Sequence, residues 1–486
     1  MMNKKAPNLL ENFALDKIKT NLSKSGVFVL FLLGIVLVVL QVFYPTLAAL
    51  VMVSVLVVCL ISFFMSKPII GFYILAVVSL FNGIELNFSQ YEWSRNLPLL
   101  LKINAPLGDF FAVILFVSVL LSLLASLLLP YKKLKHALLP TGWVLYGTSL
   151  LTGLCTSFYA YDHLAGISIY LWLRNILFVY FAFVVVPYHV INNKEEIIKL
   201  FKIWFYTGLG IALFGLSSLF MGVSVDWLRV TPYYIKGIAP LGVNHNLLAE
   251  PLVMIIPGVL FLYLFHKAKK ESKMYLGGLI FIIAIALLTL SRAAWLSVLV
   301  GILIMAIFNF GKVRDYFRHK QIGWNWLWVT IFLPVLVYMG LFLIQAPIVV
   351  GSTISRWEST KIVWFYFMRR PWFGYGSGMY LQLFNDVKVF WWEYGDPLEA
   401  HGFLQKILLE HGSIGLVLFL GFLFFVSYKL YKKFKQTAGY DLLMLQMIFV
   451  CMWMGIVFQL FNTSYYRSGM WLPIGLSVVA IKLFKD

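Results

Sequence analysis

The sequence predicts an all-α polytopic membrane protein with about 12–14 transmembrane helices and a long, partly helical extracytoplasmic loop. Three observations support this fold class. Of the 486 residues, 61% are hydrophobic and only 12% are charged, whereas soluble domains average about 45–50% and about 25%. Apolar runs long enough to cross a bilayer recur along the chain. Lys and Arg residues gather in short clusters between these runs.

Each apolar run of about 17–25 residues is a candidate membrane-spanning helix. The first run follows a polar N-terminal segment without an A-x-A cleavage site, so we expect it to be retained as a span. Several of the runs are short, and a re-entrant segment is an alternative for those. The candidates are 26–43, 46–65, 69–83, 107–129, 138–155, 167–186, 200–220, 245–265, 274–290, 293–310, 324–345, 413–428, 441–461 and 468–484.

The basic clusters predict the orientation of the chain. With both termini in the cytoplasm, the clusters 131–136, 267–273, 312–320 and 429–435 all face the cytoplasm, as the positive-inside tendency requires. This asymmetry accounts for the net charge of +19, so we expect no nucleic-acid partner. We expect membrane lipids to surround the spans.

The threading divides the chain into five segments. They are a cytoplasmic segment (1–25), an N-terminal transmembrane bundle (26–220), a central transmembrane part (221–345), a large extracytoplasmic loop (346–411) and the C-terminal transmembrane helices (412–486). A loop as long as 346–411 is either functional or disordered, and its apolar and aromatic composition argues against disorder.

Helix signals recur inside the large loop. Residues 352–370 read as a helix that starts at Ser352 or Thr353 and ends before Pro371. A glycine-rich turn, 371–380, follows. A second helix start is expected at Pro397, with Asp396 as N-cap and Glu399 as its reciprocal partner.

The stretch 399-EAHGFLQKILLEHGSIG-415 places polar residues at the entrance of a span. On a helix that begins at Pro397, His401 and Gln405 share a face, while Glu410 is about 180° away and supports a bend at Gly412. An imidazole can accept a proton near neutral pH, which makes His401 a candidate base. The alternative, a residue at the polar membrane interface, is kept for His411.

Two arginines are in unusual places. Arg292 lies at the outer mouth of two consecutive spans joined by almost no loop, so it needs an anionic partner unless it snorkels towards lipid phosphate. Arg174 lies within a span, with Asp109 and Glu250 as possible partners. A functional and a structural role for Arg174 remain equally open.

Further outward cations are Arg229 and Lys236 in the loop after residue 220, and Arg356 in the large loop. Together with Arg292 and Arg174, they are candidates for binding a diphosphate, because the planar guanidinium fork matches phosphate oxygens. The tryptophans of the large loop are either sugar-stacking surfaces or a membrane-interface belt.

Missing motifs narrow the chemistry. The chain has no HExxH, P-loop or GxSxG motif, and no acidic pair in an outward loop. The cysteines Cys59, Cys155 and Cys451 lie in apolar runs without metal-binding spacing. We therefore expect no metal and no cofactor.

Four segments resemble the shared region of the O-antigen ligase and O-antigen polymerase superfamily. They are 242-GVNHNLLA-249, 289-TLSRAAW-295, the arginine-led helix ending in P-W-F-G-Y-G, and 400-AHGFLQKILLEHGSIGL-416. Two positions depart from the family pattern: Gly402 replaces an asparagine, and His245 replaces a proline.

The resemblance implies an inverting, metal-independent glycosyltransferase of the GT-C type in the cytoplasmic membrane of a bacterium, with its active site outside the cytoplasm. The donor would be an oligosaccharide or polysaccharide on undecaprenyl diphosphate, and the acceptor a glycan, a lipid or a protein. His401 would be the base and Arg292 would bind the diphosphate, while Asn244, Asn246, Gln405 and Glu410 would support them.

The resemblance does not distinguish a polymerase of repeat units, which is the first hypothesis, from a ligase that attaches finished chains. A transporter or flippase of the same lipid-linked sugars is the alternative from another class. Transporters tend to carry charged residues along their spans, whereas here most polar residues lie in outward loops.

Overall fold

The computed structural model describes residues 45–81, 83–87, 104–128, 137, 139–222, 229–309, 347–394, 402–462 and 467–484. The chain divides into two compact units. One comprises residues 1–66 and 86–105, and its described helix is α2 (Pro45–Ser66). The other comprises residues 67–85 and 106–486. The all-α prediction is confirmed, apart from two paired three-residue strands, β1 (Glu85–Asn87) and β2 (Asn104–Pro106).

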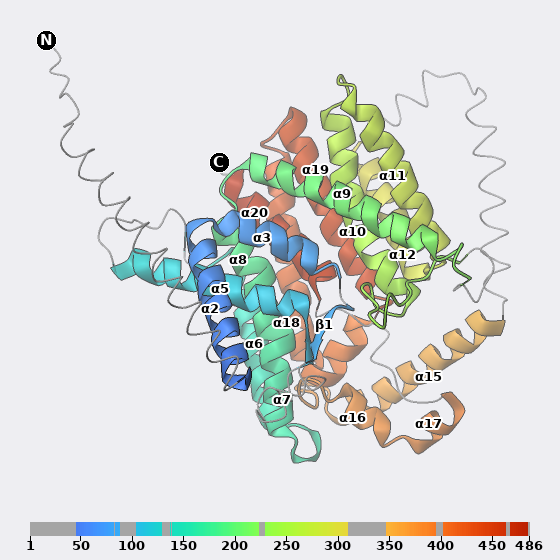
Figure 1. Ribbon diagram of the computed structural model, residues 1–486. Helices are drawn as coiled ribbons and strands as arrows, with labels where there is room; N and C mark the ends of the chain where they lie inside the picture. Colours follow the sequence, from blue (N-terminus) through green and yellow to red (C-terminus); the bar gives the residue numbers. More distant parts are fainter. Residues whose placement is uncertain are drawn as a thin grey trace, which may run out of the picture. The chain divides into compact units, whose positions relative to one another are not determined.

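The larger unit is a bundle of helices followed by shorter helices in the large loop (Figure 1). The bundle elements are α3 (Pro68–Val78), α5 (Leu107–Leu128), α6 (Trp143–Phe158), η3 (Tyr161–His163), α7 (Ala165–Trp172), η4 (Leu173–Phe178), η5 (Phe181–Val185), α8 (Val186–Val190), α9 (Lys194–Ser217), α10 (His245–Phe265), α11 (Glu271–Leu288) and α12 (Arg292–Phe308). The loop helices are α15 (Pro347–Arg369), α16 (Tyr380–Asn385) and α17 (Lys388–Tyr394), and the chain continues with α18 (Phe403–Phe434), α19 (Gly439–Gln459) and α20 (Ser468–Leu483).

The predicted spans correspond to helices wherever the structure describes them. Among the described residues, seven helices are long and apolar enough to cross a membrane, or eight if the broken pair Val51–Ser66 and Pro68–Val78 is one span. Two shorter apolar helices, α12 and α20, match the candidates 293–310 and 468–484. The candidates 26–43 and 324–345 lie outside the described residues.

Helices α10 and α19 form the centre of the larger unit. Their most apolar windows are 78% and 72% buried, and α10 packs against α9, α11 and α19. A helix that is apolar all round can only be placed inside a bundle or against lipid. Helix α10 tolerates Pro251 and Pro257 in its interior, as is common in membrane helices with close neighbours.

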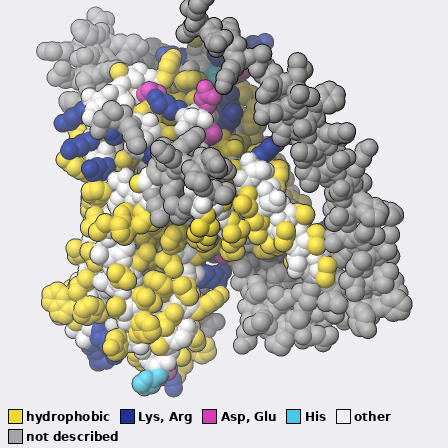
Figure 2. Space-filling model, turned by 90° about the vertical axis from the view of Figure 1, so that its left-hand side faces the viewer, with side chains coloured by type: hydrophobic (Ala, Val, Ile, Leu, Met, Phe, Trp, Pro, Cys, Tyr) yellow, Lys and Arg dark blue, Asp and Glu magenta, His cyan; other side chains and the backbone are white. Residues whose placement is uncertain are grey.

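The two ends of the larger unit differ in character. One end carries the basic cluster at 267–273, the start of α9 and the α18–α19 turn. Lys194 of α9 pairs with Asp441 of α19 at 2.5 Å, and the ring of Phe265 in α10 packs against that of Tyr440. The other end, called here the loop end, carries the loops between α9 and α10 and between α11 and α12, together with the helices of the large loop. Figure 2 shows, over the described residues of one face, hydrophobic side chains in a broad band with Lys and Arg gathered beyond it.

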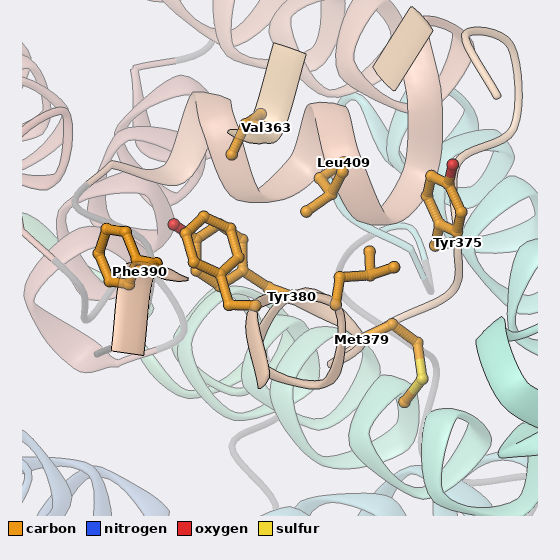
Figure 3. Packing of buried hydrophobic residues seen from close by; sticks show 8 residues of the cluster. Val363, Tyr375, Met379, Tyr380, Phe390 and Leu409 are labelled. Carbon is orange, nitrogen blue, oxygen red and sulfur yellow. The ribbon is translucent and has the colours of Figure 1, made fainter. Parts of the chain in front are cut away.

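The large loop folds around its own hydrophobic cluster (Figure 3). Val363 of α15, Tyr380 of α16 and Phe390 of α17 belong to this buried cluster, and Leu409 of α18 completes it. The prediction of a partly helical loop is confirmed. The expected start of its helix at Ser352 or Thr353 is wrong, because α15 begins at Pro347, a residue suited to the first helical position. Its end before Pro371 is confirmed.

Candidate functional site

Arg292 begins α12 and reaches across to α15. Ser291 caps α12 by accepting a hydrogen bond from the Ala294 backbone N–H, which fixes the first turn. The Nη1 atom of Arg292 donates to Oγ1 of Thr353 at 3.0 Å. The contact joins the start of α12 to a residue of α15 that lies 61 residues further along the chain.

Arg356 lies one turn after Thr353 on α15 and is partly buried. The pKa of Arg356 is lowered to about 10. Burial is the larger cause, and the neighbouring positive charge of Arg292 is the second. Its Nε atom is buried and has no hydrogen-bond partner among the described residues. An anion bound beside Arg356 and Arg292 would offset both the burial of the Arg356 charge and its repulsion by Arg292.

A third contact extends this arrangement to α18. Thr360 is one turn beyond Arg356 on α15, and its Oγ1 atom accepts a 2.8 Å hydrogen bond from Nε2 of Gln405. The Oε1 atom of Gln405 is buried and has no partner among the described residues. The roles of Thr353 and Thr360 as contacts of Arg292 and Gln405 were not predicted from the sequence. Their i, i+3, i+7 spacing with Arg356 nevertheless indicates one helix face.

The predicted supporting residues Asn244 and Asn246 lie at the start of α10, and Asn246 contacts the residue before Arg292. Asn244 caps α10 by accepting from the Asn246 backbone N–H. The Asn246 side chain accepts a 2.6 Å hydrogen bond from the hydroxyl of Ser291. The start of α10 therefore holds the residue that precedes Arg292.

Arg229 is brought to the same helix start. Its Nη2 atom lies 3.0 and 2.8 Å from the two ring nitrogens of His245. His245 is the residue that departs from the family pattern, and it binds the loop after α9 to the first residue of α10. Arg229 thus approaches the site through His245.

Lys236 and Arg174 take other positions. Lys236 lies in an exposed tight turn between Ile235 and Ile238, with φ at +48°, and no contact among the described residues joins it to Arg292. Arg174 lies in the π-helical segment η4 and pairs with Asp109 at 3.5 Å. Asp109 was one of the two predicted partners.

Glu250, the other proposed partner of Arg174, has its own contacts. It is 4% exposed and accepts a 2.7 Å hydrogen bond from Nε2 of Gln459. Its other carboxylate oxygen is 3.5 Å from Nδ2 of Asn462. Glu250 therefore joins the first turns of α10 to the end of α19.

His401 lies outside the described residues, as does the expected helix start at Pro397. The described residues contradict an unbroken helix from Pro397 to Gln405, whereas the placement of His401 on one face with Gln405 stays a prediction. Helix α18 begins at Phe403, and the preceding Gly402 is extended, with φ 167° and ψ 137°.

Gly402 is held close to another chain segment. A Cβ atom at this position would lie 2.5 Å from the carbonyl oxygen of Leu460, at the end of α19. The asparagine of the family pattern would not fit here without a shift of backbone. The departure at Gly402 is thus explained by packing.

Glu410, which was predicted to support the bend at Gly412, contacts the glycine-rich turn and the start of α16. Its carbonyl accepts from the backbone N–H of Gly376 at 2.9 Å, and its carboxylate accepts from that of Tyr380 at 3.4 Å. It is also 3.7 Å from Lys406 in a fully buried pair. Gly412 breaks α18 with φ at +69°. The predicted bend is therefore confirmed.

His411 is not at a polar membrane interface, and the expectation for it is wrong. It is 3% exposed, and its Nε2 atom lies 2.9 Å from the Ser377 hydroxyl. Ser377 in turn lies 3.3 Å from the hydroxyl of Ser157 in α6. The bend at Gly412 turns His411 into the bundle, where the hydroxyls satisfy the polar ring.

No group of three or more His, Cys, Asp or Glu residues suited to a metal ion occurs among the described residues. The cations that converge at the loop end are arginines, which bind phosphate oxygens directly. The expectation of a site without a metal stays a prediction.

Two comparisons with known proteins agree with the resemblance found in the sequence. Residues 277–420 match the protein family described as O-antigen ligase. The O-antigen ligase of Salmonella typhimurium is 25% identical over 240 residues, which cover 46% of this chain and 54% of that protein. The chain thus aligns with about half the length of this curated relative. The matched family region contains Arg292, Arg356, Gln405 and Glu410.

Proposed function

We propose that this chain, which carries the O-antigen ligase family region, is a membrane glycosyltransferase that takes its glycan from an undecaprenyl-diphosphate-linked donor. The observation that carries the proposal is the position of Arg292 and Arg356 beside each other at Thr353. A diphosphate has four or five exposed oxygens and can therefore contact two adjacent guanidinium groups. A single carboxylate has too few oxygens to do so. A lipid-linked donor reaches this place sideways from the bilayer.

The reaction we propose is a single displacement at the anomeric carbon. His401 accepts the proton of the acceptor hydroxyl, and the oxygen attacks the anomeric carbon as the bond to the diphosphate oxygen breaks. Arg292 and Arg356 stabilise the charge that develops on the leaving diphosphate. Attack from the side opposite the leaving group inverts the configuration, and the guanidinium groups take the part that a divalent cation has in other transferases.

We place the site on the extracytoplasmic side of a bacterial cytoplasmic membrane. The positive-inside tendency supports this orientation, because the basic clusters 267–273 and 429–435 lie at the end of the larger unit opposite Arg292. Both termini are then cytoplasmic. Nucleotide donors do not reach this side, which agrees with the missing nucleotide-binding motifs.

The test uses the full-length protein in liposomes with an undecaprenyl-diphosphate-linked glycan. We expect release of undecaprenyl diphosphate that depends on an acceptor. His401→Ala is expected to abolish release and to leave donor binding unchanged. His163→Ala is the matched control, because His163 is an exposed histidine in η3 at the same end of the bundle. Wild-type turnover by His401→Ala would refute the assignment of the base.

The products of the same assay identify the acceptor. A ladder of repeat units indicates a polymerase, the first hypothesis. A single transfer of a finished chain to a lipid such as lipid A core, or to a protein, indicates a ligase. Both outcomes agree with the shared reaction.

A transporter of lipid-linked sugars is the second candidate, and the charged pair Arg174–Asp109 within two spans favours it. The ion pair satisfies both charges, which also suits a structural role. Substrate that crosses the liposome membrane without release of undecaprenyl diphosphate would overturn the transferase proposal in favour of transport.

A further inference from the structure

A cavity lies at the loop end, between the last turn of α6 and the turn that follows α15. Its volume is about 560 Å³, within the range of small-molecule sites. Cys155, Thr156 and Tyr159 line it from α6, and Arg369, Arg370 and Trp372 line it from the other side. We propose that this cavity binds an anionic glycerophospholipid, with the phosphate at the two arginines and an acyl chain along the apolar wall.

The walls of the cavity are held in place by direct contacts. The Nη1 atom of Arg370 donates to the carbonyl oxygen of Tyr159 at 3.3 Å, which joins α15 to α6. The Arg370 guanidinium also lies 4.9 Å from the ring centroid of Tyr375. Behind them, the carbonyl oxygen of Pro371 accepts from both the backbone N–H and the hydroxyl of Ser413 at 2.8 Å. The cavity is therefore part of a fixed junction between α6, α15 and α18.

The charge of the lining favours an anion. Its lining residues, all in the described part of the chain, include two arginines and no acidic residue. The Arg369 guanidinium lies 4.1 Å from the Phe365 ring centroid, a contact that orients the group without neutralising it. Arg369 and Arg370 are both exposed. An anionic headgroup would supply the missing counter-charge.

The aromatic side chains around the cavity favour a lipid over a soluble anion. Tyr159 is 80% exposed, Trp372 65% and Phe373 56%. Exposed tyrosine and tryptophan side chains are typical of the interface between headgroups and hydrocarbon, and Phe373 adds apolar surface beside them. A ligand with both an anionic head and an apolar chain satisfies the arginines and the aromatic rim together.

This cavity is separate from the proposed diphosphate site. Arg356 and Arg369 lie on the same helix, α15, and the intervening residues place them roughly 20 Å apart at about 1.5 Å per residue. One lipid headgroup cannot contact both arginines. The proposal therefore does not depend on the proposed transferase activity.

Cys155 provides a reporter inside the cavity. It is exposed, whereas Cys451 is buried, and Cys59 is the other exposed cysteine. In full-length protein carrying Cys59→Ser and Cys451→Ser, the rate of Cys155 alkylation by a maleimide measures occupancy. The probes are dioleoyl phosphatidylglycerol and, as the zwitterionic comparison without net charge, dioleoyl phosphatidylcholine, each added to the detergent-solubilised protein.

We expect phosphatidylglycerol to slow alkylation of Cys155 saturably, and phosphatidylcholine to require a concentration about tenfold higher, because its quaternary ammonium group is repelled by the two arginines. Arg369→Gln should remove this preference. Lys361→Gln is the matched control, since Lys361 is an exposed cation on the same helix. Arg369→Gln is preferred to a change at Arg370, because Arg370 also bonds the backbone of α6. Size-exclusion chromatography checks that each variant is folded.

Equal protection by the two phospholipids, or an undiminished preference in Arg369→Gln, would overturn the proposal. Stronger protection by undecaprenyl diphosphate than by phosphatidylglycerol would also overturn it and would assign the cavity to a polyprenyl carrier. Protection by inorganic phosphate alone would exclude a lipid ligand. Loss of transferase activity with retained phosphatidylglycerol binding would concern the other site only.

Discussion

Arg292 at the start of α12 and Arg356 on α15 lie close enough that the charge of the first helps to lower the pKa of the second. The hydrogen bond from Arg292 to Thr353 sets this distance, because Thr353 is one turn before Arg356. The protein thus places two positive charges together at the loop end of the bundle. Such an arrangement lowers the stability of the free protein, and a bound anion would offset this loss by neutralising the positive charges.

The first prediction concerns donor binding. Replacement of either Arg292 or Arg356 by Ala should weaken the binding of an undecaprenyl-diphosphate-linked glycan about 10–100-fold, which corresponds to the loss of one charge-assisted contact of roughly 1.5–3 kcal/mol. Equilibrium binding in detergent measures this. Lys361→Ala on the same helix is the control and should bind as the wild type does. Unchanged affinity in both arginine variants would exclude the arginine pair as the diphosphate site.

The second prediction concerns the stability of the free protein. Arg356→Gln should raise the free energy of unfolding by about 0.5–1 kcal/mol, since it removes a partly buried charge that an adjacent cation opposes. Thermal unfolding without donor measures this.

The pH dependence of that gain follows from the direction of the pKa shift. The folded-state pKa of Arg356 is about 10, below the ordinary value of 12.5. Its charge therefore destabilises the fold below pH 10, and this cost is lost as the pH rises from about 10 towards 12.5. The gain in Arg356→Gln should be equal at pH 6 and pH 9. A gain that disappears within this range would mean that another group is responsible.

The third prediction concerns the bend of α18. Gly412 has φ at +69°, and a Cβ atom there would clash with the carbonyl oxygen of Trp372. Gly412→Ala should destabilise the protein by about 2–4 kcal/mol, since it adds a steric clash to a left-handed conformation. Gly421→Ala is the matched control on the same helix, where a Cβ atom would meet nothing within 4 Å, and it should be neutral or slightly stabilising. Equal unfolding temperatures in the two variants would contradict the packing of the bend against the turn after α15.

The fourth prediction concerns Gly402. Gly402→Asn introduces the residue of the family pattern but places its Cβ atom against the carbonyl oxygen of Leu460. We expect lower thermal stability and slower glycan release, with donor affinity unchanged, because the shift would move the segment next to His401. Release rate and donor affinity, measured on the same preparation, separate these effects. Activity at or above the wild-type level would show that the end of α19 adjusts freely.

The fifth prediction concerns the contact between Thr360 and Gln405. A double-mutant cycle with Thr360→Ala and Gln405→Ala should give a coupling energy of about 0.5–1.5 kcal/mol in unfolding, the range for one hydrogen bond. Denaturant unfolding of the four proteins measures it. Additive effects of the two changes would mean that the 2.8 Å contact does not form in solution.

Much of the candidate site was predictable because the residues themselves are unusual. Arg292 between two spans and Arg174 within a span are costly in hydrocarbon, so their identity alone singled them out. The bend at Gly412 was predictable for a similar reason, since glycine tolerates a left-handed backbone. The bridging roles of Thr353 and Thr360 were not predictable in this way, because threonine is an ordinary residue on a helix.

Predictions that depended on helical spacing were less secure. The spacing of His401 and Gln405 assumed one continuous helix from Pro397, and the extended backbone at Gly402 breaks that assumption. The placement of His411 at an interface followed from its position at the entrance of a span. The buried contact of His411 with Ser377 depends instead on the glycine-rich turn, whose backbone binds that of Leu409 and Glu410.

By itself the sequence determined the fold class, the spans and the residues worth testing. The reason is that the free energy of transferring a residue into hydrocarbon depends mainly on its own side chain and on its neighbours along the chain. Tertiary structure alone decided which residues meet. Arg292 donates a hydrogen bond to Thr353, Arg174 pairs with Asp109, and Gly402 packs against the carbonyl of Leu460. These contacts join segments far apart in the chain, and the packing of whole helices sets their distances. No local pattern contains that information.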